Sequence, residues 1–418
     1  MFRKKAPIAM MISILLTACG LVEQDQPQVQ PPERSRPLSM FDLEHLDNHP
    51  QVAEAIIDFS NTLLNHVMRE DAINPVLSPL SVYYALSMTA LGSRTSTYEA
   101  FQQVLGLSPQ RHSRELYLLG RHLTAGSGEE TITMANSVWI HDWFEIHPEV
   151  AEVVTAHFGG SLYTEDLRVA AAITRINDWV ERQTHGLIPA MLEELSPEVA
   201  MVLVNTLYFQ GLWDTIFPLD EGVNAFATTA GDTIQTPFLS QRAMWWQSAV
   251  TETYQAVVLP YRGGHVGMLL VMSTDGTSVR AFPYTFDEVK LAMDQHMVDV
   301  HFPAWEVSFD LALNEALEDM GLGVAFDEDH ADLWDLFTEE SRAGFDPPYI
   351  TQVLHEVKII VNRYGTEAAA ATVADVAMPS SAWMIQYELM FDQPFMYVIY
   401  QVGTNIPLFM GMIDDPSI

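Results

Sequence analysis

The sequence contains very little cysteine and lysine. Cys19 is the only cysteine in 418 residues, which excludes an internal disulfide and a metal site led by cysteine. Four lysines and sixteen arginines face 55 acidic residues, so the formal net charge is −35. A surface this acidic cannot neutralise many phosphates, and nucleic acid is therefore excluded as a partner. Such acidity favours solubility and would suit a salty medium, where screening weakens self-repulsion.

The common catalytic motifs are also absent. The sequence has no Gly-x-Ser-x-Gly elbow, no His-Glu-x-x-His pair, no phosphate loop and no Gly-x-Gly-x-x-Gly. "FDEDHADLWD" (326–335) has Asp332 where a calcium loop needs glycine, so we interpret it as a solvated acidic turn. "HDWFEIH" (141–147) is better explained by packing after a strand than by a metal site, although it offers His141, Glu145 and His147. We expect no metal, no cofactor and no enzymatic activity.

Residues 1–18 have the pattern of a signal peptide. Arg3, Lys4 and Lys5 precede "APIAMMISILL", an apolar run too short to cross a bilayer as a helix. The following "LTAC" resembles a bacterial lipobox, in which the peptide is removed before the cysteine and the thiol receives lipid. We therefore predict lipid attachment at Cys19; the alternative is a chance cysteine after an apolar run.

Residues 19–40 are predicted to form the lipidated cysteine and a flexible tether. Cleavage would leave 17 Lys+Arg against 55 Asp+Glu, a formal charge of −38. The segment is rich in Gln and Pro and lacks apolar periodicity, so it could extend about 50 Å at about 3 Å per residue. Gly20, and not Asp, follows the cysteine, which in lipoproteins of Gram-negative bacteria favours the outer membrane. We expect a bacterial envelope protein, lipid-anchored at the outer membrane or cell surface.

From residue 41 to 418 no second linker or internal repeat is found, which indicates one large α+β domain. Apolar residues at three- or four-residue spacing predict a helix over 49–70. Ser78 before Pro79, and Gly92, mark the ends of a second helix within 74–92. Further helices are predicted at 173–192, ending near Gly186, and at 312–322. Strands are predicted at 132–141, 199–209, 254–261, 265–272, 354–362, 395–402 and 407–413.

Separated motifs from about residue 50 to 416 together resemble one known family. They are "NPVLSPLSVYYALSMTALGSRTSTYEAFQQVLGL" (74–107), "ANSVWI" (135–140), "LVNTLYFQGLWDTIF" (203–217), "VLHEVKIIVNRYGTEAAAAT" (353–372) and "DQPFMYVIYQVGTNIPLFMGMIDDP" (392–416). In this order they resemble the serpins, a family of serine protease inhibitors. The resemblance implies a monomeric serpin fold, mixed helices with three β-sheets and an exposed reactive-centre loop.

The resemblance also implies a mechanism that works once. A protease cuts the loop and forms an acyl-enzyme, the cut loop inserts into the main sheet, and the attached protease is distorted before it can deacylate. The loop hinge would comprise eight residues, Gly365, Thr366, Glu367, Ala368, Ala369, Ala370, Ala371 and Thr372. Family positions further imply a framework of buried hydrogen bonds, called the shutter, at Ser78, Ser81, Asn205 and His355. Trp213 and Phe217 match the breach, where the loop first enters.

The loop sequence is compatible with insertion. Successive strand residues face opposite sides, so the small even-numbered residues from 366 to 376 would face the core, while Glu367 and Asp375 share the other face. Insertion therefore need not bury an unpaired carboxylate or overpack the sheet. From Gly365 to Met378 the extended chain would span about 45 Å at about 3.3 Å per residue. An Ala-rich linker or short surface helix is the alternative, since alanine is the best helix former.

The expected function is suicide inhibition of serine proteases at the envelope, with cysteine proteases as a second candidate target class. Two residues before the hinge, Arg363 and Tyr364, depart from the acidic residues usual in inhibitory serpins, where glutamate at the first position commonly anchors the sheet by a salt bridge. The alternative is a non-inhibitory serpin, cleaved as a substrate or used as a binding module.

The scissile bond is placed only within a range. The commonest family spacing gives Pro379-Ser380, and the alternatives involve Met378, Ala382 and Trp383. Proline makes the Met378-Pro379 bond a poor substrate because it restricts the chain and removes an N–H. No Arg or Lys lies from residue 364 to 418, so the target protease should not be trypsin-like. An elastase-, chymotrypsin-, subtilisin- or papain-like protease is expected.

Overall fold

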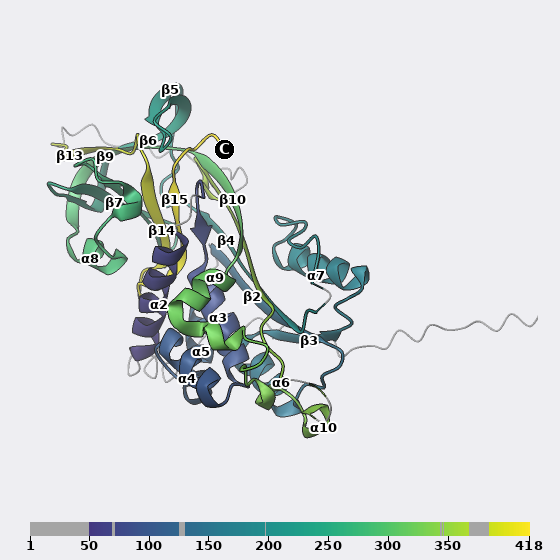
Figure 1. The fold of residues 1–418 in the computed structure, drawn as a ribbon. Coiled ribbons are helices and arrows are strands. Elements are labelled where there is room, and N and C mark those ends of the chain that lie inside the picture. Colours follow the sequence, from purple (N-terminus) through teal and green to yellow (C-terminus); the bar gives the residue numbers. More distant parts are fainter. Residues whose placement is uncertain are drawn as a thin grey trace, which may run out of the picture. The chain divides into compact units, whose positions relative to one another are not determined.

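The computed structural model describes residues 50–68, 72–124, 130–196, 198–342, 345, 347–367 and 384–418. All of them belong to one compact unit, Ser35–Ile418. The fold is α+β: one group of helices covers one face of a six-stranded sheet, and α7 (Ala170–Gln183) covers the opposite face (Figure 1). Among the described residues no helix is both long and apolar enough to cross a bilayer. Cys19 and the predicted signal and tether segments lie outside the described residues.

The helices form where the sequence places apolar stripes. The helix predicted over 49–70 is confirmed as α2 (Gln51–Val67), and its stripe from Val52 to Val67 is buried. The second predicted helix is α3 (Pro79–Ala90), with Ser78 as N-cap and Pro79 in the first turn. Every residue of α3 is buried, so it forms the centre of the helix group. The other helices are α4 (Thr95–Leu105), α5 (Pro109–Thr124), α6 (Pro148–Val153), α8 (Phe286–Leu291), α9 (Asn314–Leu317) and α10 (Glu339–Arg342).

The helix predicted within 173–192 is confirmed as α7, which ends at Gln183, three residues before Gly186. One helix prediction needs correction at its C-terminal end. The helix predicted over 312–322 is α9 for only one turn, followed by a π-helical turn over Glu318–Leu322 in which Gly321 has φ +110°. Apolar spacing alone did not reveal that break, because glycine allows a left-handed residue inside a pattern that otherwise continues.

The six-stranded sheet carries the candidate site. Its strand order is β10-β11-β12-β4-β2-β3, with an additional direct contact between β11 and β4. The strands predicted at 132–141, 199–209 and 354–362 are the long members of this sheet. Its strands are β2 (Glu130–His141), β3 (Ser161–Glu165), β4 (Met201–Leu212), β10 (Trp305–Ala312), β11 (Gln352–Asn362) and β12 (Gly365–Thr366).

The other two expected sheets are hydrogen-bonded to each other through β6 (Thr233–Val250). One end of β6 pairs with β7, while most of its length pairs with β9, and the register shifts between Gln241 and Met244. The nine strands run β1-β15-β14-β8-β7-β6-β9-β13, with β5 paired to β6. The remaining strands are β1 (Val76–Leu77), β5 (Leu219–Ala227), β7 (Tyr254–Pro260), β8 (Val266–Ser273), β9 (Asp294–Pro303), β13 (Tyr387–Met390), β14 (Phe395–Gln401) and β15 (Pro407–Ile413).

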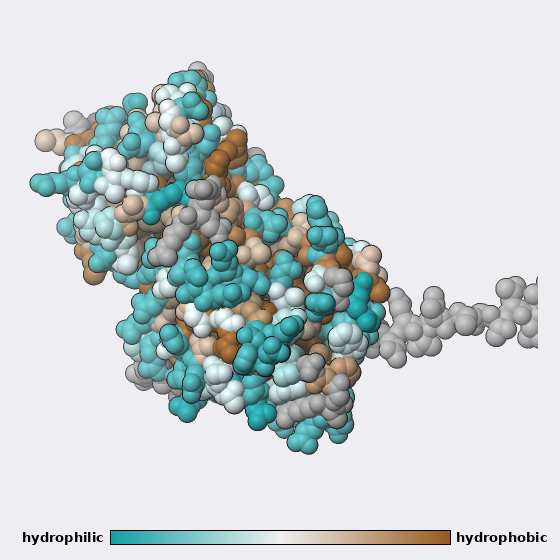
Figure 2. All heavy atoms as spheres, in the orientation of Figure 1, coloured by the Kyte–Doolittle hydropathy of each residue, from teal (hydrophilic) through white to brown (hydrophobic). Residues whose placement is uncertain are grey.

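The two faces of the six-stranded sheet bury different sets of side chains. Odd-numbered residues of β4, such as Leu203 and Leu207, belong to the main core shared with the helix group and the larger sheet. Even-numbered residues, such as Val202 and Val204, pack with Trp179 and its neighbours from α7. The molecular surface seen in Figure 2 is largely hydrophilic, in keeping with the acidic composition of the chain. We call the side covered by α7 the outer face.

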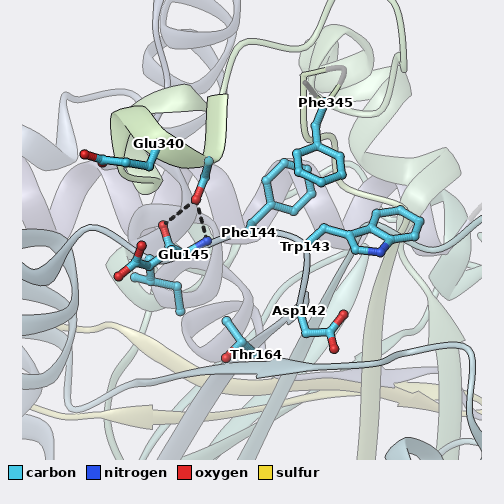
Figure 3. Close-up of a pocket in the computed structure, with 9 residues that line it drawn as sticks. Asp142, Trp143, Phe144, Glu145, Thr164, Glu340 and Phe345 are labelled. Carbon is cyan, nitrogen blue, oxygen red and sulfur yellow. Dashed lines mark hydrogen bonds between the residues drawn. The ribbon is translucent and has the colours of Figure 1, made fainter. Parts of the chain in front are cut away.

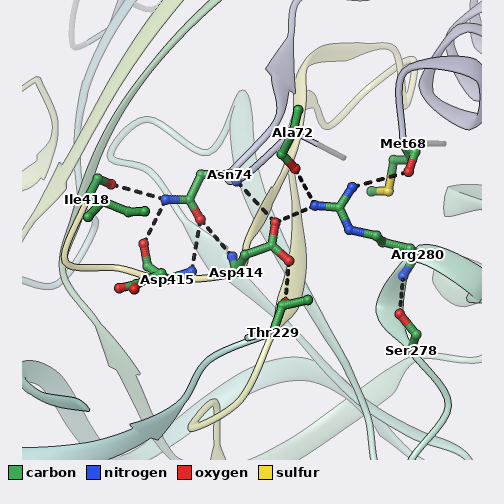
Figure 4. Close-up of polar contacts among 9 residues, drawn as sticks. All are labelled: Met68, Ala72, Asn74, Thr229, Ser278, Arg280, Asp414, Asp415 and Ile418. Atoms are coloured by element: carbon green, nitrogen blue, oxygen red, sulfur yellow. Dashed lines mark hydrogen bonds and ion pairs between the residues drawn. The ribbon is translucent and has the colours of Figure 1, made fainter. Parts of the chain in front are cut away.

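A buried polar cluster ties the end of the chain to its beginning (Figure 4). Asp414 is 2% exposed and forms an ion pair with Arg280 at 2.6 Å. Asn74 donates its backbone N–H to Asp414 and accepts the Asp414 N–H with its side-chain oxygen at 2.7 Å. Arg280 also donates to the carbonyl oxygens of Met68 and Ala72. The cluster therefore fixes β15 against the segment that joins α2 to α3, and we call it the terminal clamp.

Candidate functional site: the hinge and the shutter of the six-stranded sheet

The beginning of the predicted hinge lies inside the sheet. Thr366 is in antiparallel register with Val361 of β11 and with Gly211 of β4, so β12 forms a two-residue wedge between these strands. Gly365 is required at this entry point. A Cβ atom there would lie 1.9 Å from the carbonyl oxygen of Gly211, and its φ is +156°. Any side chain at this position would push the wedge out of the sheet.

Thr366 is the first residue of the wedge to face the core. Its side chain is fully buried, and its hydroxyl is hydrogen-bonded to the hydroxyl of Tyr261 at 2.5 Å. Burial raises the pKa of Tyr261 above its usual range, so this phenol stays neutral. Trp213 stacks on Tyr261 at 4.4 Å between ring centroids. The small side chain of Thr366 therefore fits among aromatic side chains and gives the buried Tyr261 hydroxyl a hydrogen-bond partner.

The chain that leads into the wedge is held by the predicted breach residues. Trp213 donates its backbone N–H to the carbonyl of Tyr364 at 2.8 Å and its indole N–H to that of Asn362 at 2.9 Å. Phe217 donates its N–H to the carbonyl of Arg363 at 3.0 Å. These bonds use the backbone of residues 362–364, so they do not require the acidic side chains usual at this place. No described residue forms an ion pair with Arg363, whose guanidinium lies over the ring of Tyr364.

Glu367 ends the wedge. Its backbone N–H donates to the carbonyl of Ile360 at 2.8 Å, and its carbonyl accepts from the Gln210 side chain at 2.9 Å. Its φ is +51°, a left-handed conformation that is uncommon outside glycine. Glu367 is half-buried between Tyr208 of β4 and Lys358 of β11. Burial raises the pKa of its carboxyl group to about 8, and Lys358 and the Tyr208 hydroxyl oppose this increase.

The burial of Glu367 was not foreseen. Period-two alternation places it on the outer face, opposite the buried Thr366, where a carboxylate would be solvated. The side chain does lie on the outer face, against Tyr208, but the residue has a left-handed backbone and is half-buried there. No local sequence signal identifies this turn, because glutamate has no preference for left-handed backbone.

Below the wedge, β4 and β11 pair directly with each other. The parallel register runs from Gln352 opposite Val202 to His355 opposite Asn205, and these are the only four register pairs of this ladder. Residues 206–210 and 356–360, further along the same strands, are not in register with each other. The sheet is thus closed at one end by direct pairing and at the other by a short wedge.

The four predicted shutter residues come together at the closed end. His355 is fully buried, and its Nε2 accepts the backbone N–H of Ser78 at 2.9 Å. Its Nδ1 therefore carries the proton and donates to Asn205 Oδ1 at 2.5 Å. The Ser81 hydroxyl donates to the same oxygen at 3.1 Å, and Asn205 Nδ2 donates to the backbone carbonyl oxygen of Leu354 at 3.0 Å. Burial lowers the pKa of His355 to about 3, so the imidazole is neutral.

Ser78 differs in detail from the expected cap. Its hydroxyl makes no hydrogen bond to the first turn of α3, and it has no partner among the described residues. Only its backbone contributes to the shutter, through the bond to His355. The other predicted site residues lie outside the described residues: Ala368, Ala369, Ala370, Ala371, Thr372, Met378, Pro379, Ser380, Ala382 and Trp383. The chain is described again from Met384, whose side chain is 88% exposed.

A cavity of about 520 Å³ lies at the end of β2 remote from the wedge, and Figure 3 shows the residues that line it. It follows β2 and is lined by acidic and aromatic side chains. Ser341 accepts the Glu145 N–H at 2.7 Å, and the Trp143 and Phe345 rings are nearly parallel, 6.0 Å apart. The described lining residues include the hydroxyl of Ser341 and the carboxyl groups of Glu145 and Glu340, and none of them is a histidine.

The two local clusters considered for metal binding do not converge on an ion. His141 is buried between Asp142 and Asp166, with nitrogen–oxygen distances of 2.9 and 3.3 Å, while His147 caps α6. His330 contacts Asp327 in an exposed turn. Within the part of the chain that the structure describes, no group of three His, Cys, Asp or Glu side chains is arranged to hold a metal.

Comparisons with known proteins agree with this architecture. The family model described as "Serpin (serine protease inhibitor)" matches residues 54–416. The chain is 26% identical over 386 residues to neuroserpin of Gallus gallus, covering 88% of this chain and 91% of the relative. It is 27% identical over 391 residues to antithrombin-III of Homo sapiens, covering 88% and 82%.

A solved structure gives the same result for the fold. The crystal structure of tengpin, a thermophilic serpin in the native state, superimposes with a TM-score of 0.78 at 23% identity, covering 87% of this chain and 94% of tengpin. Serpins are in general protease inhibitors and not enzymes, although some members do not inhibit. The match of the family model over most of the chain, together with the hinge and shutter geometry, establishes that this chain belongs to the serpin family.

Proposed function

We propose that this chain is a single-use protease inhibitor whose cleaved loop inserts between β4 and β11. The observation that carries the proposal is the wedge: Gly365 and Thr366 already occupy the insertion site, in register with both neighbouring strands. The family implies protease inhibition in general terms. The placement of the hinge supports the specific mechanism, because further insertion continues a ladder that has already begun.

Continuing the wedge register gives each loop residue defined neighbours. The small residues of the even-numbered set would face the core between buried apolar side chains of the two strands, until Thr372 reaches the shutter. The pairs would be Ala368 with Phe209 and Ile359, Ala370 with Leu207 and Val357, and Thr372 with Asn205 and His355. Small side chains can enter this packed interior without overfilling it, and threonine can replace hydrogen bonds that the shutter loses.

The same register places Asp375 on the outer face. Its neighbours would be Val202 and Gln352, beside an open cavity of about 310 Å³ that Gln352 and Leu354 line. The cavity would let this carboxylate reach water, which supports insertion without burial of an unpaired charge. Glu193 and Glu194 also line the cavity, so the carboxylate would meet like charges there.

The target and location complete the proposal. The absence of Arg and Lys from residue 364 to 418 supports an elastase-, chymotrypsin-, subtilisin- or papain-like protease. The lipobox-like "LTAC" supports anchoring through Cys19 to a bacterial envelope. Replacing Cys19 with serine should move the protein from the membrane fraction to the soluble fraction on cell fractionation. Membrane association unchanged by this substitution would contradict the anchor.

Covalent complex formation is the direct test of inhibition. The purified full chain is incubated with elastase, chymotrypsin, subtilisin, papain and, as negative control, trypsin, and then run on a denaturing gel. A covalent band is expected for at least one of the first four, at the summed mass of chain and protease less the C-terminal fragment that cleavage of the loop releases. Intact-mass analysis of the clipped chain then identifies the bond. Clipped product alone, with all five proteases still active, would contradict inhibition.

A non-inhibitory serpin is the second candidate, favoured by Arg363 and Tyr364 before the hinge. Thermal unfolding separates the two functions without a target protease. Nicking the loop between residues 373 and 384 should raise the melting temperature strongly if the loop inserts, since the main sheet then gains a strand. An unchanged melting temperature would favour a cleavable substrate or binding module.

A further inference from the structure

Glu367 is the residue at which the wedge ends in the uncleaved chain and from which the ladder would continue on insertion. Its backbone N–H already bonds to Ile360, the partner that the inserted register requires. On the other side, its carbonyl is held by a side chain, that of Gln210, and not by backbone. Its left-handed φ of +51° departs from the extended geometry that a continued strand requires. Glu367 therefore decides whether the ladder extends beyond Thr366.

The Glu367 side chain is held against the outer face by few polar groups. The Tyr208 hydroxyl bonds to it from β4, and Lys358 is the nearest cation on β11. Lys358 is shared, because its ammonium also contacts Glu306 at 2.9 Å. His185 packs on the far edge of Tyr208, at 4.8 Å between ring centroids. A neutral carboxyl suits this half-buried place, whereas an ionised one would lack a dedicated cation.

Further carboxyl groups lie along the same face. Glu356 precedes Lys358 on β11, directly across from Asp310 of β10. Burial, and then Asp310, raise the pKa of Glu356 to about 7. Glu306 and Asp310 on β10 add negative charge on this face, whereas Glu130 of β2, in register with Gly211, lies on the core side of the sheet. No second lysine or arginine from the described part of these strands balances this set of charges.

We infer that the carboxyl proton of Glu367 keeps residues 365–367 docked between β4 and β11, and that ionisation of this side chain releases these residues from the sheet. Glu367 is thus a positioning residue that couples docking of the wedge to pH. This device acts in the uncleaved chain and does not depend on inhibition of any protease.

The direction of the pH dependence follows from proton linkage. The docked side chain has a pKa of about 8, and a released one in water has the ordinary value of 4.5. Between these two pH values the docked form holds a proton that the released form lacks. Each unit rise in pH therefore favours release by up to about tenfold. Above about pH 8 both forms are ionised, and the dependence ends. Low pH therefore keeps residues 365–367 docked in the sheet, and neutral to mildly alkaline pH favours their release.

Native-state hydrogen exchange read by mass spectrometry tests this inference on the full chain. The readout is the protection of the amides of residues 365–367, corrected for the intrinsic pH dependence of exchange, from pH 5.5 to 9. In the wild type we expect protection to fall by up to about tenfold per pH unit and to level off near pH 8. In Glu367→Gln, which keeps the neutral shape, we expect protection that does not change with pH.

Two further variants separate Glu367 from its neighbours. Glu356→Gln removes the other carboxyl that titrates in this range and should leave the wild-type profile intact. Lys358→Gln removes the cation that lowers the pKa of Glu367 and should move the levelling point above pH 8. Thermal melting at pH 6 confirms that each variant is folded. A flat wild-type profile, a wild-type slope in Glu367→Gln, or loss of the slope in Glu356→Gln would overturn the inference.

Discussion

The two ends of the contact between β4 and β11 are held closed by opposite kinds of chemistry. At the shutter end, strands pair directly and a buried neutral histidine connects them to α3. At the wedge end, two inserted residues and a half-buried glutamic acid separate the same strands. The shutter needs a neutral imidazole whose Nε2 is unprotonated, and the wedge needs a protonated carboxyl group. The same two strands are thus joined by direct pairing at one end and by a contact that responds to pH at the other.

Their pH responses differ in sign. His355 has a folded pKa lowered to about 3, so its contribution to stability is present above about pH 6.5 and is lost as the pH falls toward 3. Glu367 has a folded pKa raised to about 8, so its contribution is present below about pH 4.5 and is lost as the pH rises through 8. Mildly acidic conditions therefore keep both ends closed.

The largest effect is expected from charging the wedge. Thr366→Arg would place a guanidinium in a fully buried position beside Tyr261 and Trp213, where it has no anionic partner. The wedge should leave the sheet, and covalent protease complex should disappear from denaturing gels while clipping of the loop continues. Thr366→Ser, which keeps the hydroxyl, is the matched control and should retain the complex. Complex formation at wild-type yield by the arginine variant would contradict the insertion route.

Removing the aromatic support of the wedge should have the next largest effect. Trp213→Ala deletes a side chain that is 1% exposed, together with its bond to Asn362. A loss of about 3 to 5 kcal/mol in the free energy of unfolding is expected from the cavity. Urea titration of the uncleaved chain measures it. Trp245→Ala, at a 59% exposed position on β6, should cost less than about 1 kcal/mol and serves as control.

Breaking the shutter should cost slightly less. Asn205→Ala leaves the His355 Nδ1–H and the Ser81 hydroxyl without their shared acceptor, at a cost of about 2 to 4 kcal/mol. The same urea titration applies. Thr206→Val changes the next residue, whose buried hydroxyl has no partner among the described residues, and should be nearly neutral. Equal destabilisation by both variants would show that burial, and not the hydrogen bonds, holds this end.

Titration of the shutter histidine should change the stability least for each pH unit measured. The stability difference between wild type and His355→Gln should shrink as the pH falls from 7 to 4, by up to about 1.4 kcal/mol per pH unit. The corresponding difference for Glu367→Gln should shrink as the pH rises over the same range. Urea titrations at several pH values measure both differences. Parallel trends in the two variants would remove the contrast between the ends of the sheet.

Much of the framework was predictable because it depends on patterns that repeat. The apolar spacing of α2, the Ser-Pro start of α3 and the continuous apolar runs of β4 and β8 each reflect burial that local sequence records. The continuity of β6 through a register shift at residues 241–244 was not predictable, since it depends on pairing with β9 far along the chain. The same holds for the π-helical turn after α9, whose glycine is permissive and not diagnostic.

The candidate site also has a part that the sequence predicts and a part that it does not. The hinge glycine and the four shutter residues were identified through family resemblance, and the structure brings the shutter residues together. The left-handed turn of Glu367, its contact with Tyr208 and its raised pKa arise only when β4, β11 and the wedge are assembled. Composition and alternation describe a strand, but they do not say where an inserted strand stops.

The terminal clamp has a consequence for how this chain is made. Asn74 and Arg280 bind groups of residues 414–418, and among the described strands β1 pairs with β15. A chain that does not yet contain residues 407–418 cannot form these contacts. The early half of the chain therefore depends on these late residues to complete the packing of its interior.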